Sequence, residues 1–188
     1  MKKTPHRFEA EHKAHLKDEN RRKVQPAKEI LERAAPTIDE VCADLGCGNG
    51  YLSLPFAVRC QAVVAIDAQR EMLMDLMSSA GEFERMKLVP VQAEASSLPL
   101  SGASVDRVLM VNMLHEVEDK EALAAEVERV LRPGGKCTVV DFQKKETSFG
   151  PPVHERIQID EVPAFFPSMR VANLWSFDEF YHYELLRL

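Results

Sequence analysis

Apolar residues along the chain fall into two alternating patterns, short continuous runs and longer stretches with helical spacing. The short runs predict buried strands at residues 41–45, 62–66, 87–92, 105–111 and 137–142. Between them, apolar positions recur every three or four residues. They predict helices after Asn49, over residues 69–79 with Gly81 as the stop, and from Asp119 to the segment 132–135. This alternation predicts an α/β fold, a doubly wound and mostly parallel sheet with helices on both faces.

The two ends of the chain follow other patterns. Residues 8–24 predict a charged, weakly amphipathic helix, and a second helix is expected between Pro26 and Pro36. Beyond the fifth strand the pattern predicts a loop at 143–156, a short helix at 160–166, and two strands at 169–177 and 181–188. Since the connection between these two strands is too short for a crossover, they are expected to pair antiparallel.

Composition narrows the class of protein. The chain has 188 residues, of which 45% are hydrophobic and 29% charged, a balance typical of one globular domain. No run approaches the ~18 apolar residues of a membrane-spanning helix, and the first residues lack the apolar stretch of a secretory signal. The four cysteines form no C-x-x-C pair, which favours a reducing, cytoplasmic compartment.

Charge is divided unevenly along the chain. The formal net charge is −6, but residues 1–35 hold ten basic against six acidic side chains, a net of +4, and the remainder carries −10. The acidic total argues against a protein that binds nucleic acid by broad phosphate neutralisation. We therefore expect neither a nucleic-acid nor a membrane partner.

The segment Asp44-Leu45-Gly46-Cys47-Gly48-Asn49-Gly50 follows a predicted strand and precedes a predicted helix, as a nucleotide-binding turn requires. Its glycines allow a tight turn and the close approach of a ligand. The G-x-G-x-G spacing differs from the G-x-G-x-x-G of dinucleotide sites, and no Lys-Ser/Thr follows as in a P-loop. An uncharged or cationic nucleoside is therefore favoured over a pyrophosphate, and the carboxylate of Asp44 favours a cation.

Asp67 stands at the end of the second strand, 21 residues after Gly46. A carboxylate at this place can accept hydrogen bonds from both ribose hydroxyls of a nucleoside. A nucleoside site of this kind has four separate requirements, and the sequence meets all of them: a strand, a glycine turn, a helix and a second strand that ends in Asp67. Together they predict a nucleoside site far more specifically than any one of them.

With these motifs the sequence from residue 38 to residue 142 resembles the class I S-adenosylmethionine-dependent methyltransferases. The resemblance extends to four further segments, namely Glu94 with Leu98-Pro99-Leu100, Ser104-Val105-Asp106, Asn112-Met113-Leu114-His115-Glu116 and residues 130–135. Within the superfamily the sequence is similar to the small ubiquinone/menaquinone-methylase-like proteins. The resemblance implies a Rossmann-like, seven-stranded sheet whose last strand is antiparallel.

The same resemblance implies S-adenosyl-L-methionine as the cofactor, with S-adenosyl-L-homocysteine as its product. Its methionine moiety is expected beside the glycine turn, with Asp44 near the amino group, Asp67 at the ribose and Glu94 at the adenine amino group. Ala93 stands where glycine is common in the family. The expected cofactor residues are Asp44, Gly46, Cys47, Gly48, Gly50, Asp67, Ala68, Glu94, Asn112 and Met113, with Gln69 as an alternative to Ala68 beside the adenine.

Methyl transfer from a sulfonium mainly requires positioning and a dry site, and a base is needed only when the acceptor must lose a proton. His115, just beyond the fourth strand, is the candidate base, and Asp141, at the end of the fifth strand, is the second catalytic candidate. Each also has a structural interpretation: His115 packs or forms a hydrogen bond at a helix start, and Asp141 fixes a loop. No metal site is expected, because His12 and His15 lack further ligands.

Four charged residues in the flanks have no assigned role: Arg21, Arg22, Glu155 and Arg156. They are either solvated charges or contacts to a substrate or to the cofactor carboxylate. The basic N-terminal segment, residues 1–36, is expected to form a helical lid over the cofactor cleft of a domain formed by residues 37–188.

Two functions remain open at this point. The first is a methyltransferase that acts on a small-molecule acceptor. The second is a regulatory or non-catalytic protein that only binds S-adenosylmethionine. A nicotinamide-dependent oxidoreductase is disfavoured by the glycine spacing and by Asp44. A quinone-like acceptor rests on the resemblance alone, and the scattered cysteines argue against arsenite.

Overall fold

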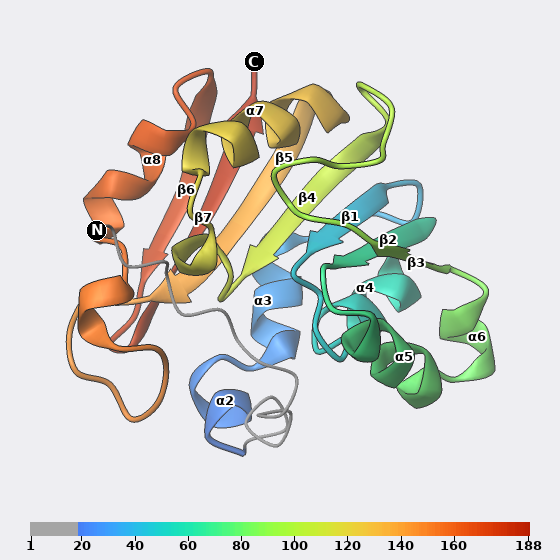
Figure 1. Cartoon of the computed structure of the whole chain (residues 1–188), viewed down its shortest axis with the longest axis horizontal. Helices are drawn as coiled ribbons and strands as arrows, with labels where there is room; N and C mark the ends of the chain where they lie inside the picture. Colours follow the sequence, from blue (N-terminus) through green and yellow to red (C-terminus); the bar gives the residue numbers. More distant parts are fainter. Residues whose placement is uncertain (1–18) are drawn as a thin grey trace.

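A seven-stranded sheet organises the computed structural model, which describes residues 19–188 (Figure 1). The strands are β1 (Val41–Leu45), β2 (Ala62–Asp67), β3 (Leu88–Gln92), β4 (Val105–Val111), β5 (Leu131–Phe142), β6 (Met169–Ser176) and β7 (Phe180–Arg187). They lie in the order β3-β2-β1-β4-β5-β7-β6. Pairing is parallel from β3 to β5, and β7 is antiparallel to both of its neighbours. The predicted sheet with an antiparallel last strand is confirmed.

Helices cover both faces of the sheet. They are α2 (Glu19–Val24), α3 (Ala27–Ala34), α4 (Ser53–Arg59), α5 (Arg70–Ser79), α6 (Glu82–Arg85), α7 (Lys120–Val130) and α8 (Val162–Phe165), with 3-10 segments η2 (Leu114–Glu116), η3 (Val153–Glu155) and η4 (Ile159–Glu161). Helices α7 and α8 pack on one face, and α3, α4 and α5 pack on the other. None of the helices formed by residues 19–188 is long and apolar enough to cross a membrane.

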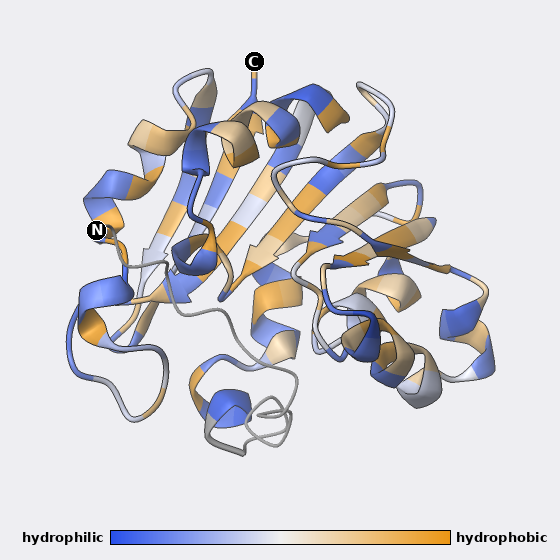
Figure 2. Cartoon of the chain, viewed as in Figure 1, coloured by the Kyte–Doolittle hydropathy of each residue, from blue (hydrophilic) through white to orange (hydrophobic). Residues whose placement is uncertain are grey.

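Side chains of the central strands alternate between two hydrophobic cores. Val139 of β5 belongs to the core beneath α7, and the adjacent Val140 belongs to the core beneath α3. Because helices cover both faces, the central strands are apolar at most positions, as Figure 2 shows. The strands therefore appear in the sequence as continuous apolar runs.

The start of β5 differs from the prediction. The predicted helix stop at residues 132–135 is confirmed, because α7 ends at Val130, but the strand that was predicted from Cys137 already begins at Leu131. Leu131 pairs with Val105, and the next pair joins Lys136 to Arg107, so the intervening residues bulge out of the ladder. A Pro-Gly-Gly segment is an ordinary helix terminator, and here the same residues also form a bulge within the strand, which was not predicted.

Other boundaries differ by smaller amounts. Helix α4 begins at Ser53, several residues later than predicted, because the glycine turn continues as far as Leu52. Helix α5 ends at Ser79, as predicted, and Gly81 also begins the short helix α6, which was not predicted. Of the predicted helix at 8–24, residues 8–18 lie outside the described residues and 19–24 are helical.

The helix cap at Asp119 is confirmed. Its side chain accepts a hydrogen bond from the amide of Ala122 at 2.8 Å and so pairs one of the free donors of the first turn of α7. This cap fixes where the chain enters α7 after η2, the segment that follows β4.

An ion pair lies in the interior of the sheet. The guanidinium of Arg107, a β4 residue with 0% exposure, donates to Glu184 of β7 at 2.9 Å and to Glu40 before β1 at 3.0 Å. Glu184 also receives a hydrogen bond from Thr138 of β5 at 2.6 Å. These bonds connect four segments across the sheet, and a buried charge of this kind requires every one of its partners.

The same cluster anchors α3. Arg33 donates from Nε to His182 Nδ1 at 3.2 Å, and His182 Nε2 lies 2.9 Å from Glu184. Since Nδ1 accepts, the ring proton is on Nε2 and is donated to Glu184. Burial lowers the pKa of His182, although Glu184 opposes that effect. The neutral ring thus links α3 to the buried ion pair.

Replacing Arg107 by alanine should destabilise the protein by about 3–5 kcal/mol, because Glu184 would remain buried without its counter-ion. The free energy of unfolding, measured in urea, tests this. Arg132→Ala is the control, because Arg132 pairs with Asp106 at a site where its side chain is 45% exposed. That variant should change stability by less than about 1 kcal/mol, and equal losses in the two variants would contradict the role assigned to Arg107.

Candidate functional site

The turn between β1 and α4 requires glycine at three places. Gly46, Gly48 and Gly50 have φ values of +65°, +53° and +89°, in the left-handed region that other residues rarely adopt. A Cβ on Gly50 would lie 2.2 Å from Leu76 Cδ1, and one on Gly46 would lie 3.0 Å from Met113 Cβ. The turn is therefore held closely between α5 and the end of β4.

Asp67, the last residue of β2, stabilises this turn through hydrogen bonds. Its carboxylate accepts hydrogen bonds from the amides of Gly48 and Gln69, each at 2.9 Å. The amide of Cys47 donates to the Ile66 carbonyl at 3.0 Å. The turn and the carboxyl end of β2 thus form one unit, with Ala68 and Gln69 immediately beside it.

Asp44 is a buried carboxylate beneath the turn. It accepts a hydrogen bond from the hydroxyl of Ser53 at 2.6 Å. Burial raises the pKa of Asp44 to about 7, although that hydrogen bond and the positive charge of Arg21 act in the opposite direction. The hydrogen bond and the charge of Arg21 therefore offset only part of the cost of burying the negative charge of Asp44. A cation placed beside this carboxylate would hold it in its charged form.

Arg21 of α2 is the cation that the N-terminal segment brings to this site. The guanidinium lies 4.3 Å above the ring of Tyr51, and burial lowers the pKa of Arg21 to about 10. Its Nε is buried and has no hydrogen-bond partner within residues 19–188. Its neighbour Arg22 is exposed. An unpaired donor on a desolvated cation is a feature expected of a site for an anionic group.

Gln25 and Asn112 join the N-terminal segment to the end of β4. Their side-chain amides exchange two hydrogen bonds, at 3.1 and 2.7 Å. Asn112 has a φ of +58°, a conformation that asparagine tolerates better than most residues. Tyr51 adds a second link, because its hydroxyl donates to the Gln25 carbonyl at 2.8 Å and accepts from the Ala27 amide at 3.1 Å.

The two predicted catalytic residues form a hydrogen-bonded pair. His115 Nδ1 lies 2.8 and 3.0 Å from the carboxylate oxygens of Asp141, and the His115 amide also donates to that carboxylate at 3.3 Å. Both side chains are nearly completely buried. Burial opposes the charged form of the ring, yet the charge and hydrogen bond of Asp141 hold the pKa of His115 above its ordinary value.

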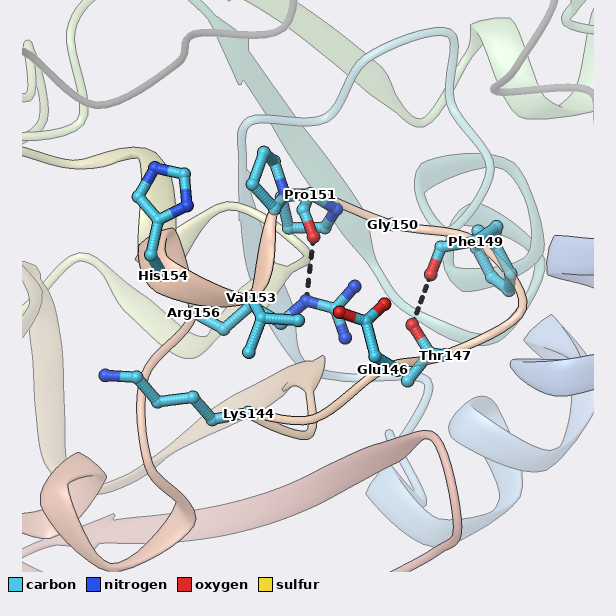
Figure 3. A pocket seen from close by; sticks show the side chains of 10 residues that line it. Lys144, Glu146, Thr147, Phe149, Gly150, Pro151, Val153, His154 and Arg156 are labelled. Carbon is cyan, nitrogen blue, oxygen red and sulfur yellow. Dashed lines mark hydrogen bonds between the residues drawn. The ribbon is translucent and has the colours of Figure 1, made fainter.

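The loop after β5 forms the outer wall beside this pair. Arg156 donates to the carbonyls of Pro151, Gln143 and Lys145 and lies 5.2 Å above the ring of Phe142. Residues of the segment 144–156 line an open pocket of about 720 Å³, shown in Figure 3. The ring of Phe142 packs edge-on against Phe149, which lines this pocket, at 5.2 Å and lies edge-on to the ring of His115 at 6.5 Å.

The structure brings most of the predicted residues to one edge of the sheet, where the parallel strands end. Asp44, Asp67, Met113 and Asp141 are buried, and Asn112 is partly exposed. Glu94 is exposed and lies two residues beyond β3, at the rim of this region. Within the described part of the chain, no three metal-binding side chains come together, and His12 and His15 lie outside it.

Sequence analysis missed two residues of this edge, Gln25 and Tyr51. Neither belongs to a motif, and their roles depend on how α2 meets the core. The only available signal was the basic charge of the N-terminal segment, which pointed to Arg21.

The geometry fits the chemistry of S-adenosylmethionine. Asp44 suits the amino group, the unpaired Nε of Arg21 suits the carboxylate, and the Cβ-free turn allows a ligand to approach the backbone closely. Asp67 stands where a carboxylate can meet ribose hydroxyls. These features come from α2, from the ends of β1 and β2, and from the turn that follows β1.

Replacing Gly50 by alanine should destabilise the protein by about 2–4 kcal/mol, because it combines a left-handed backbone with a clash against Leu76. Gly134→Ala is a matched control, since Gly134 has a φ of +77° but open space around its Cβ position. That variant should lose only about 1 kcal/mol. Thermal unfolding of both variants measures the difference, and equal shifts would show that the Leu76 contact does not constrain the turn.

Comparisons with known proteins agree with this site. Residues 43–139 match the family model described as "Methyltransferase domain". A ubiquinone/menaquinone biosynthesis C-methyltransferase of Acidiphilium cryptum is 30% identical over 78% of this chain and 59% of its own length. A demethylmenaquinone methyltransferase of Renibacterium salmoninarum is 32% identical over 57% of this chain and 43% of its own length. The chain thus spans about half of the length of these curated relatives.

A solved structure described as a SAM-dependent methyltransferase from Aquifex aeolicus superposes with a TM-score of 0.89. It covers 97% of this chain and 100% of its own, at 21% sequence identity, which supports the fold. The resemblance found in the sequence, and the cofactor that it implied, are confirmed at the level of the family. The chain belongs to the methyltransferase-domain family of class I, S-adenosylmethionine-dependent proteins.

Proposed function

We propose that this protein transfers the methyl group of S-adenosylmethionine to a small-molecule acceptor and leaves S-adenosylhomocysteine. One observation carries the proposal: the left-handed glycine turn lies between the carboxylates of Asp44 and Asp67, at the same sheet edge as the His115–Asp141 pair. A cofactor site and an ionisable pair on adjacent strand ends suit transfer better than binding alone. The free thiols of the four cysteines, all buried, support a reducing, cytoplasmic location.

We assign the cofactor contacts residue by residue. Asp44 would hold the amino group and Arg21 the carboxylate of the methionine moiety, beside Gly46, Cys47, Gly48 and Gly50. Asp67 would accept from the ribose hydroxyls, and Ala68 and Glu94 would contact the adenine. Asn112 and Met113 would form the wall on the side of β4. When bound, the sulfonium supplies an already activated methyl carbon, so the protein mainly contributes position and exclusion of water.

His115 and Asp141 supply the proton chemistry. Asp141 holds Nδ1 and thereby directs Nε2 away from β5. The neutral ring can then accept a proton at Nε2 from an acceptor that must lose one, and Asp141 stabilises the resulting imidazolium. Because the pKa of His115 is raised, this base becomes neutral at a higher pH than an ordinary histidine does.

The N-terminal segment acts as a lid in this proposal. Arg21 and Gln25 come from the part of the chain that precedes α3, and both reach the edge of the cofactor site. In Figure 1, α2 lies beyond the carboxyl ends of the central strands. Release of the Gln25–Asn112 amide pair would free this segment from β4, whereas α3 would stay anchored through Ile30, Leu31 and Ala34 in the core.

Calorimetric titration with S-adenosylhomocysteine tests the cofactor assignment. Arg21→Met should weaken binding roughly tenfold or more, because a charge-assisted hydrogen bond is lost. Arg22→Met, which removes the same charge from an exposed neighbour, should change the affinity less than about twofold. A wild-type protein that fails to bind at near-millimolar ligand would reject the proposed function, and equal effects of the two variants would reject the role of Arg21.

Deleting residues 1–25 tests the lid in the same titration. The truncated protein should stay folded, as judged by a cooperative thermal transition, but bind S-adenosylhomocysteine more weakly than Arg21→Met does. Unchanged affinity in the folded truncation would contradict the lid.

The titration of His115, followed by NMR of its ring, tests the catalytic pair. The apparent pKa of His115 should lie above the ordinary histidine value of about 6.5, because Asp141 stabilises the imidazolium. Asp141→Asn should lower that pKa, and Asp178→Asn, which removes an exposed carboxylate, should leave it unchanged. If the pKa of His115 does not respond to Asp141→Asn, the pair does not control the protonation of this base.

A further inference from the structure

Two of the four cysteines are in contact with each other in the core beneath α3. Cys42 is the second residue of β1, and Cys60 directly follows the last residue of α4. Their Sγ atoms lie 3.1 Å apart, both residues have 0% exposure, and both are free thiols. Since a disulfide bond joins two sulfur atoms at about 2.05 Å, these sulfurs need to approach each other by only about 1 Å to form one.

Backbone hydrogen bonds hold the two thiols in this contact. Cys42 lies in β1, which is paired with β2 on one side and with β4 on the other. The carbonyl of Cys60 accepts a hydrogen bond from Nζ of Lys87 at 2.7 Å. The amide of Gln61 donates to the carbonyl of Glu40 at 2.9 Å, so the chain that leaves α4 is bound to the residue just before β1. The contact is therefore fixed by both segments.

Positive charge faces the pair. Arg107 is the partner of Cys42 in the β1–β4 register, so the two side chains project from the same face of the sheet. Nη2 of Arg107 is buried and has no hydrogen-bond partner among residues 19–188. This guanidinium group thus brings an unpaired donor and a positive charge to the level of the thiols.

The contact also distinguishes the two sulfurs. A hydrogen bond from the Cys42 thiol lowers the pKa of Cys60, although burial and the charge of Glu40 act in the opposite direction. The same contact and burial raise the pKa of Cys42. Because the thiolate is the form that attacks a disulfide, Cys60 is the more reactive of the two.

Cys60 stands where the fold opens more easily than it does at Cys42. It follows the last turn of α4, and its neighbours Arg59 and Gln61 are exposed. The ends of helices open locally at a lower free energy than central strands do, and β1 is a central strand. A small reagent therefore reaches Cys60 before it reaches Cys42.

We propose that Cys42 and Cys60 form a modification site, at which a low-molecular-weight disulfide oxidises the two thiols to an intramolecular disulfide bond. The inference does not depend on the proposed function. The bond would close a loop that contains Asp44, the three left-handed glycines and Ser53, and so limit the separation of β1 from α4. A reducing compartment keeps the thiols free, and the bond forms when small disulfides accumulate.

The exchange balances in two steps. The thiolate of Cys60 attacks one sulfur of the reagent, forms a mixed disulfide and releases the other half as a thiolate, which takes up the proton that Cys60 lost. The thiolate of Cys42 then attacks the Cys60 sulfur, and the second half leaves and takes up the proton of Cys42. Two cysteine thiols are oxidised, and one reagent disulfide is reduced to two thiols.

Incubation of the folded protein with 2-hydroxyethyl disulfide, without denaturant, tests the proposal. Mass spectrometry should show a loss of about 2 Da, for two hydrogen atoms, and peptide mapping should join Cys42 to Cys60. The melting temperature should rise by roughly 5–10 °C, because a closed loop of this length restricts the unfolded chain. Dithiothreitol should reverse both changes.

Single variants test the order of the two steps. Cys42→Ala should stop at a mixed disulfide on Cys60, and Cys60→Ala should form no cross-link. Cys137→Ala is the matched control, since it removes another buried thiol and should still form the bond between Cys42 and Cys60.

Three results would overturn the proposal, and all of them are read from the wild type, so they do not depend on the folding of any variant. They are thiols that the reagent leaves unchanged in the folded protein, a bond that involves Cys47 or Cys137 instead, and a cross-linked protein whose melting temperature is unchanged or lower.

Discussion

The parallel register of β1, β2, β4 and β5 is the constraint on which the rest of the structure depends. Leu45 pairs with both Ile66 and Met110, and Val111 pairs with Val140, so the four strands end at nearly the same level. Asp44, Asp67, Asn112 and Asp141, which stand at or near these ends, are therefore brought to one edge although 97 residues of sequence separate the first from the last. A shift of one residue in any pair would turn a carboxylate from the site into a core.

The buried ion pair of Arg107 stabilises that register from within the sheet. It joins β4 to β7 and to the segment before β1, and through His182 it also reaches α3. The cluster thereby links the sheet to α3. The ion pair keeps the strand ends aligned. This alignment supports an edge whose backbone is partly left-handed and whose polar groups are not all paired.

The sequence predicted what local patterns determine. Apolar runs marked the first five strands, the pattern near the end of the chain marked β6 and β7, and the glycine turn with Asp67 marked the predicted cofactor edge. It was incomplete where one segment has two roles. Pro133-Gly134-Gly135 follows the end of α7 and also forms a bulge in β5, and Gly81 follows the end of α5 and also begins α6. Gln25 and Tyr51 were missed because their roles arise from tertiary packing of α2, α3 and α4, which no local pattern in a single sequence records.

Unpaired polar atoms distinguish the two charged regions of the protein. Within residues 19–188, the buried side-chain atoms without partners belong to five residues: Arg21, Arg33, Arg107, Glu155 and Tyr181. Those of Arg33 and Arg107 are on guanidinium groups that are already bound by other nitrogens. Of the other three, Arg21 lies over Tyr51 beside the glycine turn, and Tyr181 stands opposite Asp141 at the end of β5. The unpaired atoms of Arg21 and Tyr181 thus stand where the parallel strands end, whereas those of Arg33 and Arg107 belong to the ion-pair cluster in the interior.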